Sequence, residues 1–113
     1  MSFYSLPIST RTVTVKRIAN TTTTTLLEAD SGNIEIGLIH ICNVDGTAAV
    51  DVTLDLYDGT NATRLLSTYP VAADSFIDVE GSVLLNGWSL RVTSGDADGQ
   101  LHITMQHTVA SPR

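Results

Sequence analysis

The stretch AVDVTLDLYDG, residues 49–59, decides the fold class of this chain. Apolar and polar residues alternate along it with a period of two, which places the apolar ones on one face of a β-strand. That face carries Val50, Val52, Leu54 and Leu56. Asp58-Gly59 then favours a tight hairpin turn, because glycine adopts a positive φ at little cost. The stretch therefore predicts a half-buried strand, with Asp51 and Asp55 solvated on its outer face.

The same pattern of short strands between turn residues repeats along the chain. Three more dipeptides predict hairpin turns, namely Asp45-Gly46, Asn86-Gly87 and Asp98-Gly99. The expected strands cover residues 11–18, 21–29, 33–43, 49–57, 64–69, 76–79, 83–85, 88–93 and 101–109. No segment shows the apolar spacing of a helix.

These strands predict an all-β fold: a single compact antiparallel β-sandwich, jelly-roll or immunoglobulin-like, with eight to nine short strands. The expected organisation is an extended N-terminal arm at residues 1–10, the β-sandwich domain at residues 11–110 and a loose tail at residues 111–113.

Composition and charge indicate which partners to expect. Charged residues make up 16% of the 113 residues, against roughly 25% in an ordinary soluble domain, and threonine occurs 16 times. A surface low in charge packs against neighbours at little desolvation cost, which favours self-assembly. The net charge of −6 argues against binding to nucleic acid.

The charge is unevenly distributed. Residues 1–27 carry +3 and residues 28–113 carry −9. A basic segment of this kind can dock on an acidic neighbour. An ordinary first strand that carries three cations explains the pattern equally well.

The strand NIEIGLIHICN, residues 33–43, has large apolar groups on both faces. That pattern is typical of a strand covered on both sides, whereas a chain of this length has one core. We therefore expect a second copy of the chain to cover one face, with Ile39 and Ile41 at the contact. Gly37 indicates a bulge or a close approach by other backbone. The other expected interface residues are Phe3, Tyr4, Arg11, Lys16 and Arg17.

No combination of residues predicts catalysis, a metal site or a cofactor. Cys42 and His40 supply only two of the three or four ligands that zinc requires, and no Gly-x-Ser-x-Gly turn occurs. The stretch SGDADG, residues 94–99, lacks the closing glutamate of a calcium loop and favours a hairpin turn. We expect no enzyme activity and no small-molecule ligand.

Trp88 is the one residue for which a ligand is an open alternative. It can stack on a sugar ring, with Tyr57 and Tyr69 as further candidates, as in carbohydrate-binding modules. Its row with Leu90 and Val92 favours packing at the core or at its rim.

The expected location follows from segments that the sequence lacks. The stretch MSFYSLPIST has neither the charged start nor the long apolar run of a secretory signal, and no stretch is long enough to span a membrane. A single cysteine in a small domain is typical of a reducing compartment. We expect synthesis in the cytoplasm and no membrane partner.

Residues 21–109 resemble small structural proteins of tailed-phage particles. The resemblance lies in the layout: a threonine-rich lead-in, an apolar strand ending in Cys42-Asn43, the alternating strand from Val50 to Leu56, and a strand carrying Gly87, Leu90, Arg91 and Val92. Residues 1–20 lie outside it. The resemblance implies a compact β-sandwich, trimeric in many members of that group, with a mechanical role.

On this resemblance the chain is a non-enzymatic virion protein made in the host cytoplasm. The expected role is that of a capsid decoration or cement protein, a homotrimer that binds the major capsid protein or another virion protein across capsid subunits. The alternatives are a tail or fibre-attachment component and a carbohydrate-binding or adhesin-type module.

Overall fold

The computed structural model describes residues 11–109, which form nine β-strands. They are β1 (Arg11–Ile18), β2 (Thr24–Glu28), β3 (Ile34–Asn43), β4 (Val50–Tyr57), β5 (Ala62–Val71), β6 (Ser75–Val79), β7 (Val83–Leu84), β8 (Ser89–Ser94) and β9 (Leu101–Val109). β5 continues through Pro70, where the sequence predicted its end. An edge strand tolerates this proline because its missing N–H has no partner to lose.

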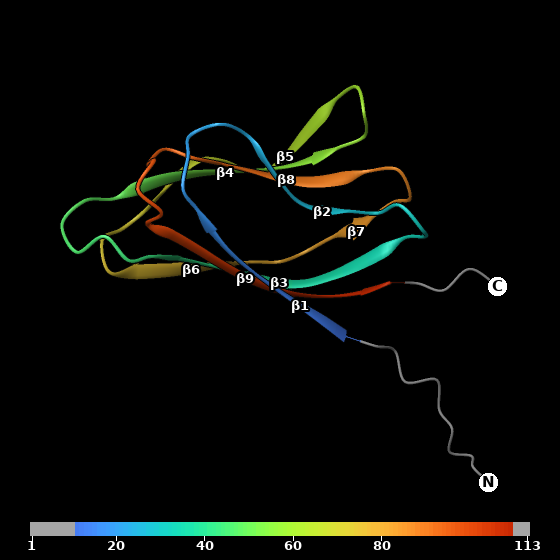
Figure 1. The fold of residues 1–113 in the computed structure, drawn as a ribbon, viewed down its shortest axis with the longest axis horizontal. Helices are drawn as coiled ribbons and strands as arrows, with labels where there is room; N and C mark the ends of the chain where they lie inside the picture. The colour runs from blue at the N-terminus through green and yellow to red at the C-terminus, as the bar shows by residue number, and fades with distance from the viewer. Residues whose placement is uncertain (1–10, 110–113) are drawn as a thin grey trace, which may run out of the picture.

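The strands form two antiparallel sheets that lie face to face (Figure 1). Sheet I has the order β1-β9-β3-β6, with β7 also paired to β3, and sheet II has the order β2-β8-β4-β5. The partners are nested in the chain: β1 with β9, β2 with β8, β3 with β6 and β7, and β4 with β5. One long hairpin wrapped over itself gives this order, which is that of a jelly roll and not of an immunoglobulin-like sandwich.

The turn dipeptides reverse the chain where the sequence predicts, but three of the four do not close hairpins. Asp58-Gly59 joins the paired strands β4 and β5. The other three connect a strand of one sheet to a strand of the other, so the hairpin prediction is wrong for them, including the loop at residues 94–99. The backbone is left-handed at Gly59, Gly87 and Gly99, with φ of +101°, +93° and +74°.

Two aspartates stabilise turns through their carboxylates. Asp58 accepts hydrogen bonds from the backbone N–H of Asn61 at 2.7 Å and of Thr60 at 2.8 Å, which lowers its pKa below the ordinary value. Asp45 accepts from the backbone N–H and the hydroxyl of Thr47 and from the N–H of Ala48, and its pKa is lowered in the same way.

The core lies between the sheets and is built from alternating residues of both. Its fully buried side chains include Leu54, Leu90 and Val92 of sheet II and Ile39, Ile41, Leu101 and Ile103 of sheet I. Trp88 packs against the rim of this core, as its row predicts.

A β-bulge at Gly37 and Leu38 exchanges the two faces of β3. The pairing of β3 with β9 shifts register between Ile36 and Ile39. Ile34 and Ile36 therefore face the core before the bulge, and Ile39 and Ile41 face it afterwards. The apolar residues on both faces of the sequence pattern serve one core. This corrects the expectation of a second cover over the whole strand, since Leu38 is the only large apolar side chain of β3 that stays exposed, at 57%.

Gly81, which lies between β6 and β7, packs against this bulge on the side of β3 that is opposite β9. A methyl group at Gly81 would overlap the carbonyl oxygens of Ile36 and Gly37. Next to it, the N–H of Ile36 donates to the carbonyl of Ser82 at 3.1 Å. The close backbone approach that the sequence placed at Gly37 is thus made possible by the glycine opposite it.

Asn43 ties the end of β3 to sheet II. Its buried amide Nδ2 donates to the carbonyls of Ala48 and Val71, both at 2.9 Å. Its Oδ1 accepts from the N–H of Asp45 at 2.9 Å. Every bond therefore satisfies a backbone group near the sandwich end where the chain passes from β3 to β4.

Candidate interaction surface

The outer face of sheet I exposes large apolar side chains. Antiparallel register places Val13 opposite Gln106 and Val15 opposite Thr104, and the Val15–Thr104 row continues to His40 and Asp78. Val13, Val15, Leu38 and Phe76 are 56%, 68%, 57% and 55% exposed. We call this face, with these four residues, the apolar outer face. Single exposed apolar residues are ordinary, whereas several on one sheet face indicate a contact surface.

His40 belongs to the same face and is paired on it. Its Nδ1 lies 2.8 Å from Oδ1 of Asp78, and its ring centroid lies 4.8 Å from that of Phe76. The bulge turns His40 and the half-buried Cys42 outward, away from the core. His107 lies on the core row of β9 and is buried.

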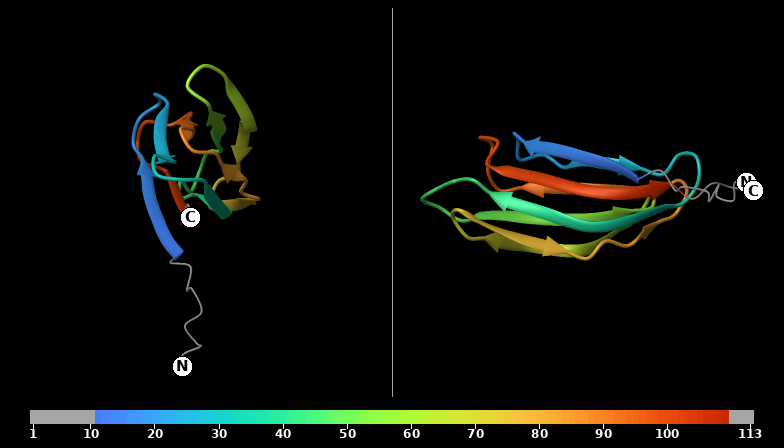
Figure 2. Two further views of the ribbon diagram at one scale, coloured as in Figure 1. Left: turned by 90° about the vertical axis from the view of Figure 1, so that its right-hand side faces the viewer. Right: turned by 90° about the horizontal axis from the view of Figure 1, so that it is seen from below.

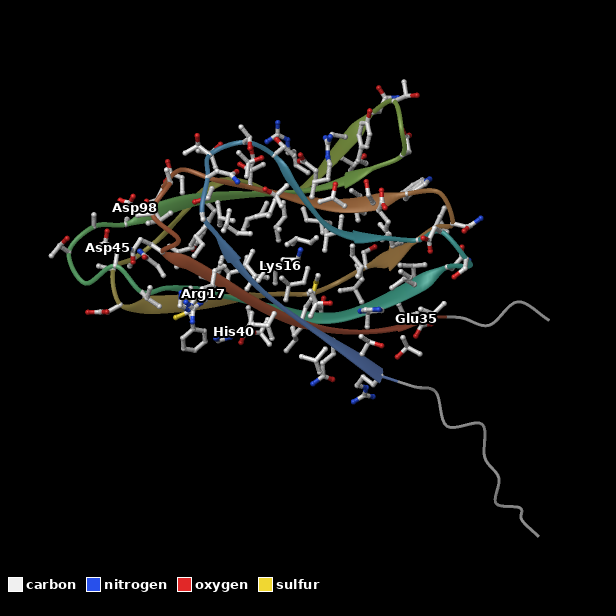
Figure 3. All side chains as sticks on the ribbon, viewed as in Figure 1. Lys16, Arg17, Glu35, His40, Asp45 and Asp98 are labelled. Carbon is white, nitrogen blue, oxygen red and sulfur yellow. The ribbon has the colours of Figure 1, made fainter. Side chains whose placement is uncertain are left out.

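The three predicted basic residues lie on β1, the free edge of sheet I. Figure 3 labels two of them, Lys16 and Arg17. Arg11 and Arg17 share the outer face with Val13 and Val15, because alternate residues of a strand point the same way. Lys16 projects from the opposite face of the strand and is still exposed. Both faces of this edge therefore carry positive charge.

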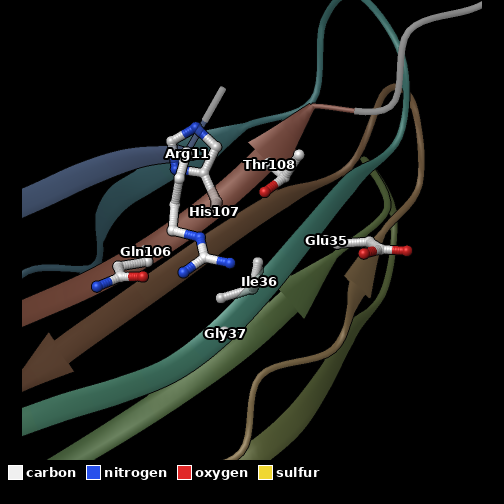
Figure 4. A pocket seen from close by; sticks show the side chains of 7 residues that line it. All are labelled: Arg11, Glu35, Ile36, Gly37, Gln106, His107 and Thr108. Carbon is white, nitrogen blue, oxygen red and sulfur yellow. The ribbon is translucent and has the colours of Figure 1, made fainter. Parts of the chain in front are cut away.

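Arg11 also lines a shallow hollow of about 290 Å³ with Glu35, Gln106 and Thr108. Its guanidinium lies across β9 towards Ile36, while the carboxylate of Glu35 points away from it (Figure 4). The hollow gathers no set of side chains that would bind one ligand.

The structure corrects the expected interface at two residues. Ile39 and Ile41 have no exposed surface, because the bulge turns them into the core, so we do not retain them as contact residues. Leu38 replaces them on the outer face of β3. Phe3 and Tyr4 lie outside the described residues, and their role as contacts stays a prediction.

A groove between the free edges of β5 and β6 was not predicted. It holds about 460 Å³ and is lined by Leu66, Tyr69, Ile77, Asp78, Val79 and Glu80. The alternation Ile77-Asp78-Val79-Glu80 is visible in the sequence, but only the strand order shows that β6 is an edge.

The outer face of sheet II is polar and largely paired within itself. Oδ1 of Asp55 lies 3.0 Å from Nε of Arg64, and Oδ2 lies 3.7 Å from Nη2 of Arg91. The guanidinium of Arg91 lies over the Tyr57 ring, 3.8 Å from its centroid. Asp55 is buried by these neighbours, which corrects the expectation that it is solvated; Asp51 is exposed as expected.

Within residues 11–109, no group of three or more histidine, cysteine or acidic side chains is placed to hold a metal ion. The same part of the chain contains no helix with the length and apolar character to cross a membrane.

Comparison with solved structures finds a similar fold in viral capsid proteins. No family model and no curated protein sequence matches this chain. A solved pentameric capsid protein, isolated from metagenomic phage sequences, is 14% identical with a TM-score of 0.53; the match covers 96% of this chain and 70% of that one. A chain of the T13 IBDV viral particle is 11% identical with a TM-score of 0.50, and the match covers 88% of this chain and 31% of that one. At these identities the likeness shows the fold alone.

Proposed function

We propose that this protein is a non-enzymatic structural component of a virion, a decoration or cement protein that stabilises the phage head by packing across capsid subunits as a homo-oligomer. The apolar outer face of sheet I carries the proposal, because four large apolar side chains on one face favour contact with a neighbour. The jelly-roll fold, which solved capsid proteins share, supports the same role. Many weak contacts of this kind add up when they repeat across a lattice.

The expected attachment has two parts. The apolar outer face supplies contact area, and the uncharged, apolar-rich segment of residues 1–10 reaches beyond β1 to the shell. β1 begins at Arg11 opposite Thr108, one residue from the end of β9, so residues 1–10 join the described body at this end of sheet I.

Co-sedimentation with purified heads that lack this protein tests the proposal. We expect the wild type to pellet with heads, and both deletion of residues 1–10 and Leu38→Asp to abolish binding while circular dichroism stays that of a folded β-protein. Thr25→Asp, which adds the same charge to the exposed polar face of sheet II, is the matched control and should bind normally. Undiminished binding of both test variants, or binding to tails and not to heads, would contradict the decoration role.

A further inference from the structure

We propose that the two open edges of the sandwich bind each other between copies, so that β1 of one copy docks in the β5–β6 groove of the next. This inference rests on the proposed role in one respect, because it names a second copy of the chain as the partner in self-association. It assigns an occupant to the β5–β6 groove, and it assigns an acidic partner to the three cations on β1.

The donor edge combines apolar groups with unneutralised positive charge. Val13 and Val15 are among the most exposed apolar residues of the described chain. Arg11, Lys16 and Arg17 supply three positive charges, and β1 contains no acid. Within residues 11–109 neither Lys16 nor Arg17 has an ion-pair partner, whereas Arg64 and Arg91 both approach Asp55.

The acceptor edge has the complementary character. The side chains of Leu66, Ile77 and Val79 lie in the groove at the boundary of the core and stay partly exposed there. Asp78 and Glu80 border them, both exposed, and no lysine or arginine lines the groove, although Oδ1 of Asp78 lies 2.8 Å from Nδ1 of His40. An apolar floor with an acidic border fits valines flanked by arginine and lysine better than it fits an uncharged segment.

The two edges lie on opposite sides of the molecule, as Figure 2 shows for β1 and β2 against β5 and β6. β1 runs antiparallel to β9, β9 to β3 and β3 to β6, so β1 and β6 run in opposite directions. A second copy rotated about an axis along the strands therefore presents its β1 antiparallel to β6, and the rotation can turn the face with Val13 and Val15 towards the groove.

Contacts between like edges are disfavoured by charge. Two β1 edges would bring six cations together, and two β6 edges would bring acid against acid. The contact is thus head-to-tail, and repetition of a head-to-tail contact closes a ring when the rotation permits. The charge pattern selects this contact over a two-fold dimer.

Charge reversal with a swap tests the inference on the full chain, in solution and without heads. We expect wild-type protein to associate in sedimentation velocity at low salt. Lys16→Glu/Arg17→Glu and Asp78→Lys/Glu80→Lys should each raise the Kd of association by about tenfold or more, because like charges then face one another. The quadruple variant should recover association, since the charges are again opposite. An equimolar mixture of the two double variants should also associate, because each supplies the edge that fits the other.

Asp30→Lys/Asp98→Lys is the matched control, because it makes the same charge change at exposed acids that belong to neither β1 nor the β5–β6 groove. It should associate as the wild type does, and circular dichroism checks that every variant is folded. A wild type that stays monomeric, double variants that associate normally, or a quadruple variant that stays monomeric would each overturn the inference. Loss of association only on deletion of residues 1–10 would make that segment the occupant instead. Head binding is measured separately, so failure here leaves the decoration role standing.

Discussion

The outer faces of sheets I and II are built from strands of similar length, but they differ in which side chains they leave exposed to solvent. On sheet II the carboxylate of Asp55, a charged group that is costly to bury, is covered by its own neighbours Arg64 and Arg91. On sheet I, Leu38 and Phe76 are left more than half exposed. One face is completed within the chain and the other is left for a neighbour, so the contact surface is best recognised by what the fold does not cover.

Two adjacent residues, Leu38 within the bulge and Ile39 directly after it, give the largest expected contrast. Ile39→Ala removes a fully buried side chain and should lower the free energy of unfolding by about 3–4 kcal/mol. Leu38→Ala removes a side chain that is 57% exposed and should change it by less than about 0.5 kcal/mol. Urea unfolding followed by the fluorescence of Trp88 measures both. Equal losses would show that Leu38 is covered within the monomer and would remove the contrast between the faces.

Substitution of Gly81 tests what holds the bulge in place. Gly81→Ala should lower the free energy of unfolding by about 2–3 kcal/mol, because the methyl group meets backbone carbonyls that cannot move as a side chain would. Gly37→Ala is the control, since its methyl group would lie at ordinary contact distance, 3.5 Å from the carbonyl oxygen of Gln106. Urea unfolding of the two variants gives the comparison. A harmless Gly81→Ala would mean that the approach of residue 81 does not hold the bulge.

The outer face of sheet II should become less stable when its central carboxylate, that of Asp55, is removed. Asp55→Ala leaves Arg64 and Arg91 without their anion and should lower the free energy of unfolding by about 2 kcal/mol, less than for a fully buried pair because both arginines reach solvent. Asp51→Ala, on the same strand but exposed, should have little effect. Association in solution should be unchanged in both variants. A loss of association in Asp55→Ala alone would place the contact on the wrong sheet.

Much of the strand layout could be predicted because alternation and turn chemistry are local. β1 and β9 begin and end at the predicted residues, and the inward row of β4 is the predicted one. The pairing of strands could not be predicted, since a dipeptide such as Asn86-Gly87 reverses the chain without specifying whether the next strand joins the same sheet. Glycine chemistry is the same in both cases, and the destination of the chain depends on long-range packing.

The candidate surface was predicted in part. The cations of β1 are visible in the sequence, and the structure places them on a free edge. Ile39 and Ile41 were misplaced because one extra residue in a strand exchanges its faces, and the sequence marks that residue only by Gly37. The β5–β6 groove had no local signal, because it is formed by two strands whose free edges only the complete strand order brings to one side of the molecule.

The smallest expected effect concerns the turns that follow one strand of each sheet, Asp45 after β3 and Asp58 after β4. Hydrogen bonds lower the pKa of both carboxyls in the folded protein, so their stabilising contribution is present above about pH 4 and is lost as the pH falls through the folded pKa. Asp58→Asn keeps an acceptor for the N–H groups of Thr60 and Asn61 but removes the titration. We therefore expect the Tm of the wild type to fall slightly more than that of Asp58→Asn between about pH 5 and pH 2, measured by circular dichroism. If Tm falls equally with pH in the two proteins, the charge of Asp58 adds nothing to its hydrogen bonds. The turn between β4 and β5 is then held by those hydrogen bonds alone.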